Sequence, residues 1–356
     1  METPEPFEIG GRPINQGTKP LFLPDIGTFF NRDIPLAISI IDSLADAGLT
    51  LIKGEILQNT EVCLPGDLVE NYLASDGSTI LAENYRSLIE RKTVPLEAYR
   101  RIFGHCARRQ VDFVLSVYDF EGAAFAKEIG AVALKISSSN ITHYPLITYV
   151  AGLGLPIVLD TGHATLAEAE RAVAWCRAMG ENRIITEHSP PAPPNPVSNH
   201  NLMFMGSLAA RCGTFIGLSD HHLGSEMLLA AIPMGAVVLE KGVAVDSITN
   251  EQDLQHALSL SAIPSVMKSI DRVHSAIGDG ADRDLSGKPQ YKSRMGMVAS
   301  KNLSIGAELT LDSVRFAFPA IGIPTEFWPE IEGMTAAKPI KSGTPIYWSS
   351  IHARLP

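Results

Sequence analysis

The chain has 356 residues, of which 45% are hydrophobic, and this length suits a barrel of about 250 residues followed by a module of about 70. The formal net charge of −10 argues against a nucleic-acid partner, because neutralising phosphates requires clustered Lys and Arg. The first residues do not form a basic start followed by an apolar run, and no apolar stretch approaches the roughly 20 residues that span a bilayer. We therefore expect a cytoplasmic protein with no membrane contact.

Short apolar runs alternate along the chain with longer segments of helical period. Each run turns polar at its C-terminal end, as strands of a parallel sheet buried on both faces do. Between the runs, segments such as 34–48 and 165–180 have the spacing of amphipathic helices, with Thr165 as an N-cap and Gly48 and Gly180 as stops. The runs, in order, are 21–26, 49–56, 112–118, 131–137, 155–161, 183–189, 214–221 and 236–242.

Eight strands alternating with helices predict either a closed barrel or a doubly wound α/β sheet. The first strand is not followed by a GxGxxG turn, which favours a (β/α)₈ TIM barrel over residues 1–277. A Gly- and Asp-rich segment at 278–291 is typical of a linker. Residues 292–356 contain short strands and turns, and we expect them to form a small β-rich domain.

Catalytic groups of such barrels come from the C-terminal ends of the strands. The polar residues that end the apolar runs are therefore the candidates for an active site. They are Asp25, Lys53, Glu55, Ser116, Lys135, Ser138, Asp160, Thr161, His163, Glu187, His188, Ser219, Asp220, His221, His222, Glu240 and Lys241.

Three of these candidates are lysines, namely Lys53, Lys135 and Lys241. A lysine on a buried strand is costly unless its charge meets an anion. Each could pair with a neighbouring carboxylate such as Glu55 or Glu240. Three lysines converging on one barrel mouth favour an anionic substrate instead.

Histidines also gather at the strand ends, and neutral imidazole is a common ligand of Zn²⁺ or Mn²⁺. They could instead be hydrogen-bonded residues of the barrel mouth or general bases. The density of His163, His188 and His221, with Asp160 nearby, favours a metal site. Of the adjacent pair His221 and His222, only one should face inward.

Several motifs, in order along nearly the whole chain, are similar to those of one family. They are PDIGTFFNRDIPLA, IKGE, LKISSSNITHYPLI, LDTGHATLAEAERAV, IGLSDHHLG, GAVVLEKGVAVD and QHALSL. On these motifs the chain resembles the sialic acid synthases, including the members that act in spore-coat polysaccharide synthesis. The C-terminal segment resembles the antifreeze-like (SAF) domain that ends these enzymes.

The resemblance implies a transferase that forms a C–C bond between phosphoenolpyruvate and an amino sugar or aldose. It implies a divalent metal, Mn²⁺ or Mg²⁺ with Zn²⁺ as an alternative, and a domain-swapped homodimer in which Arg294 reaches the partner's site. By position, Lys53, Lys135, Ser138 and Ser219 would bind phosphoenolpyruvate, and His221 would ligate the metal. The catalytic set then comprises Asp25, Lys53, Lys135, His221 and Lys241, with Asn140, Asp220 and Gln255 as further substrate contacts.

The chain departs from the family pattern at several of these positions. Gly242 stands where the family has its second metal-binding histidine. Asp160 stands at the position of a serine, and His163, Glu187 and His188 are new ionisable groups. These changes predict a rebuilt site that holds a metal through His221 with His163, His188 or Asp160.

Three functions follow from these patterns. The first is a phosphoenolpyruvate-dependent synthase of a nonulosonic or related 3-deoxy sugar acid. The second is a metal-dependent lyase or hydrolase on the same barrel. The third is a non-catalytic relative that binds a sugar, against which the number of new ionisable groups argues.

Overall fold

The computed structural model describes residues 4–74, 78–191, 195–245, 248, 251, 253–282 and 290–352. The chain divides into two compact units, residues 1–278 and 279–356. Part of the segment expected to be a linker, 283–289, lies outside the described residues. None of the described helices is long and apolar enough to cross a membrane.

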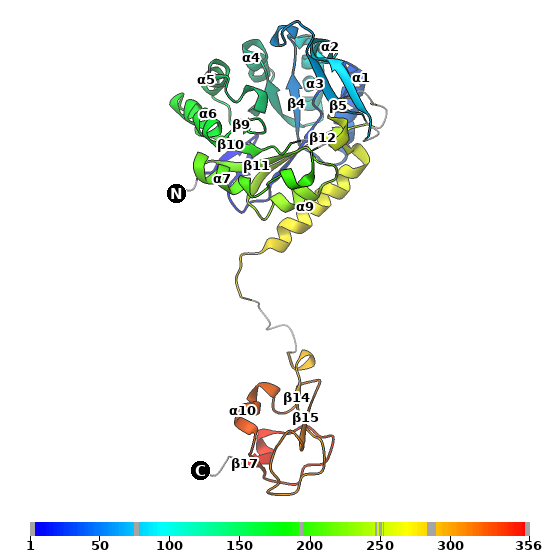
Figure 1. Cartoon of the computed structure of the whole chain (residues 1–356), viewed down its shortest axis with the longest axis vertical. Coiled ribbons are helices and arrows are strands. Elements are labelled where there is room, and N and C mark those ends of the chain that lie inside the picture. The colour runs from blue at the N-terminus through cyan, green and yellow to red at the C-terminus, as the bar shows by residue number, and fades with distance from the viewer. Residues whose placement is uncertain are drawn as a thin grey trace. The chain divides into compact units, whose positions relative to one another are not determined.

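The first unit is a closed barrel of eight parallel strands, which confirms the predicted fold class (Figure 1). Each strand pairs with its neighbour in sequence order, and β12 pairs with both β11 and β3 to close the ring. The strands are β3 (Leu21–Asp25), β4 (Leu51–Ile56), β7 (Asp112–Val117), β8 (Ala133–Ile136), β9 (Ile157–Asp160), β10 (Ile184–His188), β11 (Phe215–Asp220) and β12 (Ala236–Ala244).

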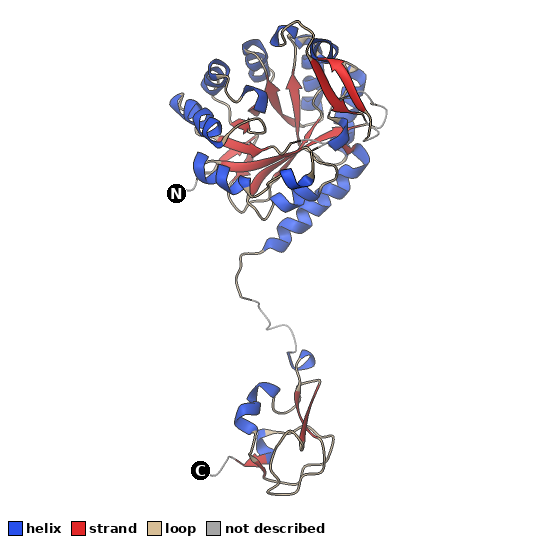
Figure 2. Cartoon of the chain, viewed as in Figure 1, coloured by secondary structure: helices blue, strands red, loops and turns tan. Residues whose placement is uncertain are grey.

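Helices enclose this ring of strands (Figure 2). The sequence sets their ends: Asp33 caps α1 through the amide of Leu36, and Thr165 is the N-cap of α6, as predicted, where it forms a capping box with Glu168. The helices of this unit are α1 (Ile34–Asp46), α2 (Tyr85–Lys92), α3 (Leu96–Arg108), α4 (Phe120–Glu128), α5 (Tyr144–Gly152), α6 (Leu166–Ala178), α7 (Phe204–Cys212), α8 (Glu226–Ala231) and α9 (Ile263–Ile277).

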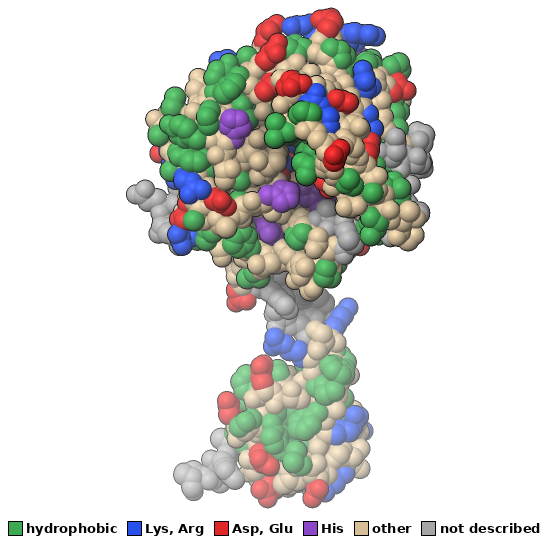
Figure 3. Space-filling model, turned by 45° about the horizontal axis from the view of Figure 1, so that its top comes forward, with side chains coloured by type: hydrophobic (Ala, Val, Ile, Leu, Met, Phe, Trp, Pro, Cys, Tyr) green, Lys and Arg blue, Asp and Glu red, His purple; other side chains and the backbone are tan. Residues whose placement is uncertain are grey.

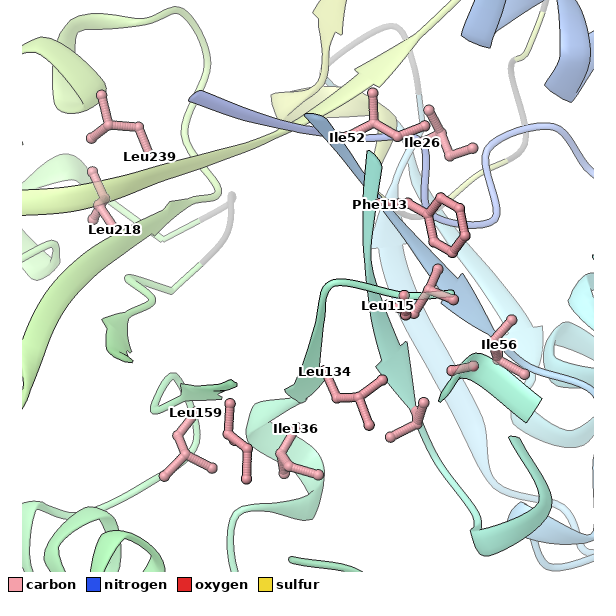
Figure 4. Packing of buried hydrophobic residues seen from close by; sticks show 14 of the residues in the cluster. Ile26, Ile52, Ile56, Phe113, Leu115, Leu134, Ile136, Leu159, Leu218 and Leu239 are labelled. Carbon is pink, nitrogen blue, oxygen red and sulfur yellow. The ribbon is translucent and has the colours of Figure 1, made fainter. Parts of the chain in front are cut away.

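The main core lies between the strands and the helices. Outward-facing residues such as Ile52, Leu134, Leu218 and Leu239 are fully buried there, and Figure 4 shows their packing. Successive side chains of a strand point to opposite faces, so the alternate residues point into the barrel. The polar residues at the strand ends, including Lys53, are therefore carried on the inner face.

Two antiparallel hairpins were not predicted. The first, β1 (Phe7–Ile9) with β2 (Arg12–Ile14), packs its buried isoleucines against residues from the first halves of the barrel strands. The second, β5 (Val69–Leu73) with β6 (Ile80–Asn84), follows β4, and its first strand lines the cavity described below. A two-residue strand, β13 (Leu258–Ser259), extends the sheet beside β12.

The second unit has its own small core, built from residues such as Met297, Leu309, Ile323 and Ile346. Its regular elements are short: β14 (Gly296–Ala299), β15 (Val314–Ala317), α10 (Trp328–Ile331), β16 (Thr335–Ala336) and β17 (Ile351–His352). The strands pair as two antiparallel ribbons, β14 with β15 and β16 with β17. This is the small β-rich domain that the sequence predicts.

Candidate active site

A cavity of about 390 Å³ opens at the C-terminal ends of the barrel strands. Figure 3 shows histidine side chains beside a hollow on this face of the barrel unit. The hairpin β5–β6 contributes one wall through Tyr72 and Leu73. The acidic and basic residues that line the cavity are Asp25, Lys53, Glu55, Glu70, Lys135, Asp160, His163, Asp220, His221, Glu240, Asp253 and His256.

Lys53 projects from β4 into this cavity, although only 3% of its side chain is exposed. Its Nζ lies 2.5 Å from Asp25 Oδ2, 3.4 Å from Glu55 Oε1 and 3.7 Å from Glu240 Oε1. Burial alone would lower the pKa of Lys53, but these carboxylates raise it well above its usual value. The side chain is therefore a fixed positive charge.

Lys135, from β8, is surrounded in the same way. Its Nζ lies 2.6 Å from Glu240 Oε1, 2.7 Å from Glu187 Oε2 and 3.1 Å from Asp160 Oδ2. These three carboxylates overcome burial and raise the pKa of Lys135. Pairing of the lysines with carboxylates, one of the two alternatives open from the sequence, is therefore what the structure shows.

Five carboxylates thus face two ammonium groups at the centre of the barrel. Burial raises the pKa of Asp25 to about 6 and that of Glu187 to about 8. Burial would raise the pKa of Glu240 too, but Lys135 and Lys53 lower it to about 2. The excess negative charge is therefore relieved by protons on Glu187 and, at lower pH, on Asp25.

Glu187 is the most deeply placed of these carboxyls, with no exposed surface. Its Oε1 has no hydrogen-bond partner among the described residues. Gly217, on the next strand, makes room for it: a Cβ there would lie 2.9 Å from Glu187 Cγ. The sequence placed Glu187 among the candidates but gave no sign that it would pair with Lys135.

Two residues expected in the site face away from the cavity. On β10 the side chain of Glu187 points inward, so the side chain of the next residue, His188, points outward. There His188 Nε2 lies 2.7 Å from the carbonyl oxygen of His200, and the His188 ring contacts Phe204. On β12 the side chain of Glu240 points inward and that of Lys241 points outward, with Lys241 Nζ 2.8 Å from Asp220 Oδ2. Neither His188 nor Lys241, both expected to act in the site, therefore lines the cavity.

Three histidines do line the cavity. His163 Nδ1 lies 2.9 Å from Ser138 Oγ, and His221 Nδ1 lies 3.1 Å from Ser189 Oγ. His256, which was not among the predicted site residues although it lies in the QHALSL motif, contacts the His221 ring edge-on, with the ring centroids 4.8 Å apart. Of the adjacent pair, only His221 lines the cavity; His222 does not.

The remaining expected substrate contacts are divided. Ser138, Ser219 and Asp220 line the cavity, whereas Asn140 and Gln255 do not. The amide of Gln255 instead donates to the carbonyl of Ala74. Arg294 belongs to the second unit, where its Nη1 atom lies 4.0 Å from Glu326 Oε1.

The described residues do not fit a divalent metal ion. Among them, no group of three or more His, Cys, Asp or Glu side chains is arranged to hold one. Asp160 is directed at Lys135, with its Oδ2 3.1 Å from Lys135 Nζ, so this carboxylate is already paired. The expected metal site at His221, His163, His188 or Asp160 is therefore not formed by these side chains.

Comparison with known proteins gives matches over both units. The model of the NeuB family matches residues 40–282, and the model of the SAF domain matches residues 294–352. An N,N'-diacetyllegionaminic acid synthase from Campylobacter jejuni is 27% identical over 329 residues, covering 91% of this chain and 97% of that protein. A pseudaminic acid synthase from Helicobacter pylori is 24% identical, and the match covers 94% of this chain and 99% of that protein.

Solved structures share the fold. The N-acetylneuraminic acid synthetase of Leptospira borgpetersenii superposes with a TM-score of 0.68 at 23% identity, covering 80% of this chain and 94% of that one. The spore coat polysaccharide biosynthesis protein SpsE of Bacillus subtilis superposes with a TM-score of 0.64 at 22% identity, and the match covers 99% of this chain and 100% of that one.

Proposed function

Because this chain belongs to the NeuB family, we propose that it is a sugar-acid synthase that condenses phosphoenolpyruvate with an aldose or N-acyl amino sugar. The product would be a nonulosonic or related 3-deoxy sugar acid, in keeping with the names of the relatives. One observation carries the proposal: two buried, positively charged lysines, Lys53 and Lys135, point into a single cavity at the C-terminal ends of the barrel strands.

In the proposed reaction, C3 of phosphoenolpyruvate attacks the aldehyde carbon of the sugar, and the aldehyde oxygen takes up a proton. Water adds to C2, the bond between C2 and the phosphate oxygen breaks, and phosphate leaves as the ketone forms and a proton is released. Lys53 and Lys135 would hold the anionic donor, with Ser138 and Ser219 as further contacts. Asp25 lines the same cavity, and its pKa of about 6 suits a group that gives and takes a proton near neutral pH.

Binding an anion here requires the lysines to exchange partners. The carboxylates that they release, above all Glu187 and Asp25, would lie close to the new negative charge, which raises their pKa further. We therefore expect phosphoenolpyruvate binding to take up protons, so that its affinity falls as the pH rises from 7 to 9, by at most about tenfold per pH unit for each proton taken up.

Calorimetric titration with phosphoenolpyruvate in two buffers of different ionisation enthalpy checks this expectation. The apparent binding enthalpy should differ between the buffers in the direction of proton uptake. Glu187→Gln, which cannot take up the proton, should reduce the difference. Equal enthalpies in the two buffers would contradict the proposed exchange of partners.

The synthase itself is tested by measuring phosphate release from phosphoenolpyruvate across a panel of plain and N-acyl aldoses, with and without added Mn²⁺. We expect release only when donor and sugar are supplied together. No release with any sugar under either condition would contradict the proposal. Turnover of a sugar alone would support the lyase or hydrolase instead, and sugar binding without turnover the non-catalytic alternative.

We also propose that the chain forms a domain-swapped homodimer in which Arg294 contacts the sugar bound by the partner. Arg294 has an exposed side chain, so Arg294→Ala should leave folding intact. It should raise the KM for the sugar and leave the KM for phosphoenolpyruvate unchanged. Light scattering that shows a monomer at assay concentrations would contradict the proposal.

A further inference from the structure

We infer that this cavity works without a bound divalent metal ion, because an aromatic ring fills the space in which a metal ligand would have to stand. The inference rests on the proposed function, since it concerns how that reaction is run. Three features of the described residues lead to it: the packing at Gly242, the partners of the cavity histidines, and the partners of the cavity carboxylates.

Gly242 lies near the end of β12 and lines the cavity beside Phe29. A Cβ atom at this glycine would lie 3.1 Å from Phe29 Cζ, 3.2 Å from Phe29 Cε2 and 3.7 Å from the Cβ of Ala257. Phe29 is itself buried, with 4% of its surface exposed. A Cβ atom at residue 242 would therefore require the packed ring of Phe29 to move by a few tenths of an ångström, and a side chain as large as histidine would need more of the space that the ring fills.

The position matters because of its neighbours in the sheet. Gly242 is the register partner of Asp25, and Asp25 is that of Lys53, so the three residues stand side by side on adjacent strands. A ligand from residue 242 would enter the cavity at the same level as Lys53. The ring of Phe29 occupies that entry and offers no atom that can coordinate a divalent ion.

The histidines of the cavity do not replace the metal ligand that residue 242 lacks. His221 has Ser189 on its Nδ1 and the ring of His256 at its edge. Asp253 Oδ1 lies 3.8 Å from His256 Nε2. Two imidazoles packed edge to face, with one carboxylate beyond them, do not form the converging set that a bound ion requires.

The inner carboxylates have other partners. Asp25 and Glu55 are directed at Lys53, and Asp160 and Glu240 at Lys135. A divalent ion would have to compete with two buried ammonium groups for these oxygens and would bring positive charge toward both of them. Among the described lining residues, Lys53 and Lys135 then supply the positive charge that faces the reacting groups.

The test is a titration of the full chain with Mn²⁺, followed by electron paramagnetic resonance of the free ion. Wild type is expected to bind no ion that depends on His221, so His221→Asn should give the same titration. A stoichiometric ion that is lost in His221→Asn would overturn the inference. An ion that stays in this variant but is lost in Asp160→Asn or Asp253→Asn would lie in the cavity and would also overturn the inference, whereas an ion that stays in all three variants lies outside the cavity.

A gain of function tests the role of the ring directly. Phe29→Ala with Gly242→His opens the space and adds an imidazole to the cavity that His221 also lines, and this double variant should gain more than about tenfold in Mn²⁺ affinity. Phe29→Ala, which opens the space without adding a ligand, is the matched control and should gain none. Circular dichroism confirms that both variants fold. A folded double variant that binds no better than wild type would overturn the inference.

The Mn²⁺ titrations do not depend on turnover by the protein. If the synthase is active, protein treated with a chelator should release phosphate at the rate of untreated protein, and a loss of rate restored by Mn²⁺ would overturn the inference. If no sugar supports turnover, the proposed function fails, while the titrations still report whether the cavity holds an ion.

Discussion

Replacing Lys135 with methionine is expected to destabilise the barrel by about 3–5 kcal/mol, which is the usual cost of breaking a buried ion pair. Methionine keeps the length of the apolar stem but removes the ammonium group. The carboxyls of Asp160, Glu187 and Glu240 would then face one another without the ammonium group that they share. Among the described residues the other nearby ammonium group is that of Lys53, and of these three carboxyls it lies within 4.0 Å of Glu240 only. Chemical denaturation followed by circular dichroism measures the loss.

Two controls make this result specific. Lys127→Met changes an exposed lysine, whose Nζ donates to the carbonyl of Leu153, and should alter stability by less than about 0.5 kcal/mol. Adding Glu240→Gln to Lys135→Met removes an ionised carboxylate that has lost its ammonium partner and should restore part of the loss. If Lys135→Met costs no more than Lys127→Met, the three carboxyls do not depend on this lysine.

Glu187→Gln is expected to change the dependence of stability on pH. Burial raises the pKa of Glu187 to about 8, against 4.5 for a free glutamate, so the folded chain keeps a proton that the unfolded chain has lost. The stability that this proton supplies is complete below pH 4.5, declines as the pH rises, and is gone above pH 8. Glutamine does not titrate, so the variant avoids this decline.

The difference in unfolding free energy, variant minus wild type, should therefore rise between pH 4.5 and 8 by up to about 1.4 kcal/mol per pH unit. It should be flat above and below that interval. Glu97→Gln, a change at an exposed side chain, is the control. A difference that stays constant across the interval, or that falls with rising pH, would show that Glu187 is ionised in the folded chain.

The strands and helices of the barrel could be predicted because their patterns are local. Residues 183–189 and 236–242 are apolar runs with polar ends, and Thr165 is an N-cap that the structure confirms. The hairpins could not be predicted. β5 and β6, with the sequences VENYL and ILAEN, are short and rich in polar residues, and they pair with each other rather than with the barrel.

The site was predicted in outline, because strand ends in a barrel meet at one mouth whatever their separation in sequence. Which of two neighbouring polar residues points inward was not predictable, since shifting a strand by one residue exchanges its two faces. That uncertainty misplaced His188 next to Glu187 and Lys241 next to Glu240. The pairing of Lys135 with Glu240, across 105 positions, leaves no local signal either.

Residues from loops were the hardest to foresee. Phe29 and Asp253 line the cavity from segments outside the barrel strands, where no periodicity marks the inward face. Gly242 could be recognised only as a missing histidine. That its space is filled by Phe29 required the packing of the folded chain.

A crystal structure of the chain grown with phosphoenolpyruvate tests the central claim most directly, which is that Lys53 and Lys135 exchange buried carboxylates for an anionic donor. The predicted result is phosphoenolpyruvate in the barrel cavity, within hydrogen-bond distance of both Nζ atoms, with Asp160 turned away. A bound molecule elsewhere, or an empty cavity with both lysines still held by Asp25, Glu187 and Glu240, would contradict it.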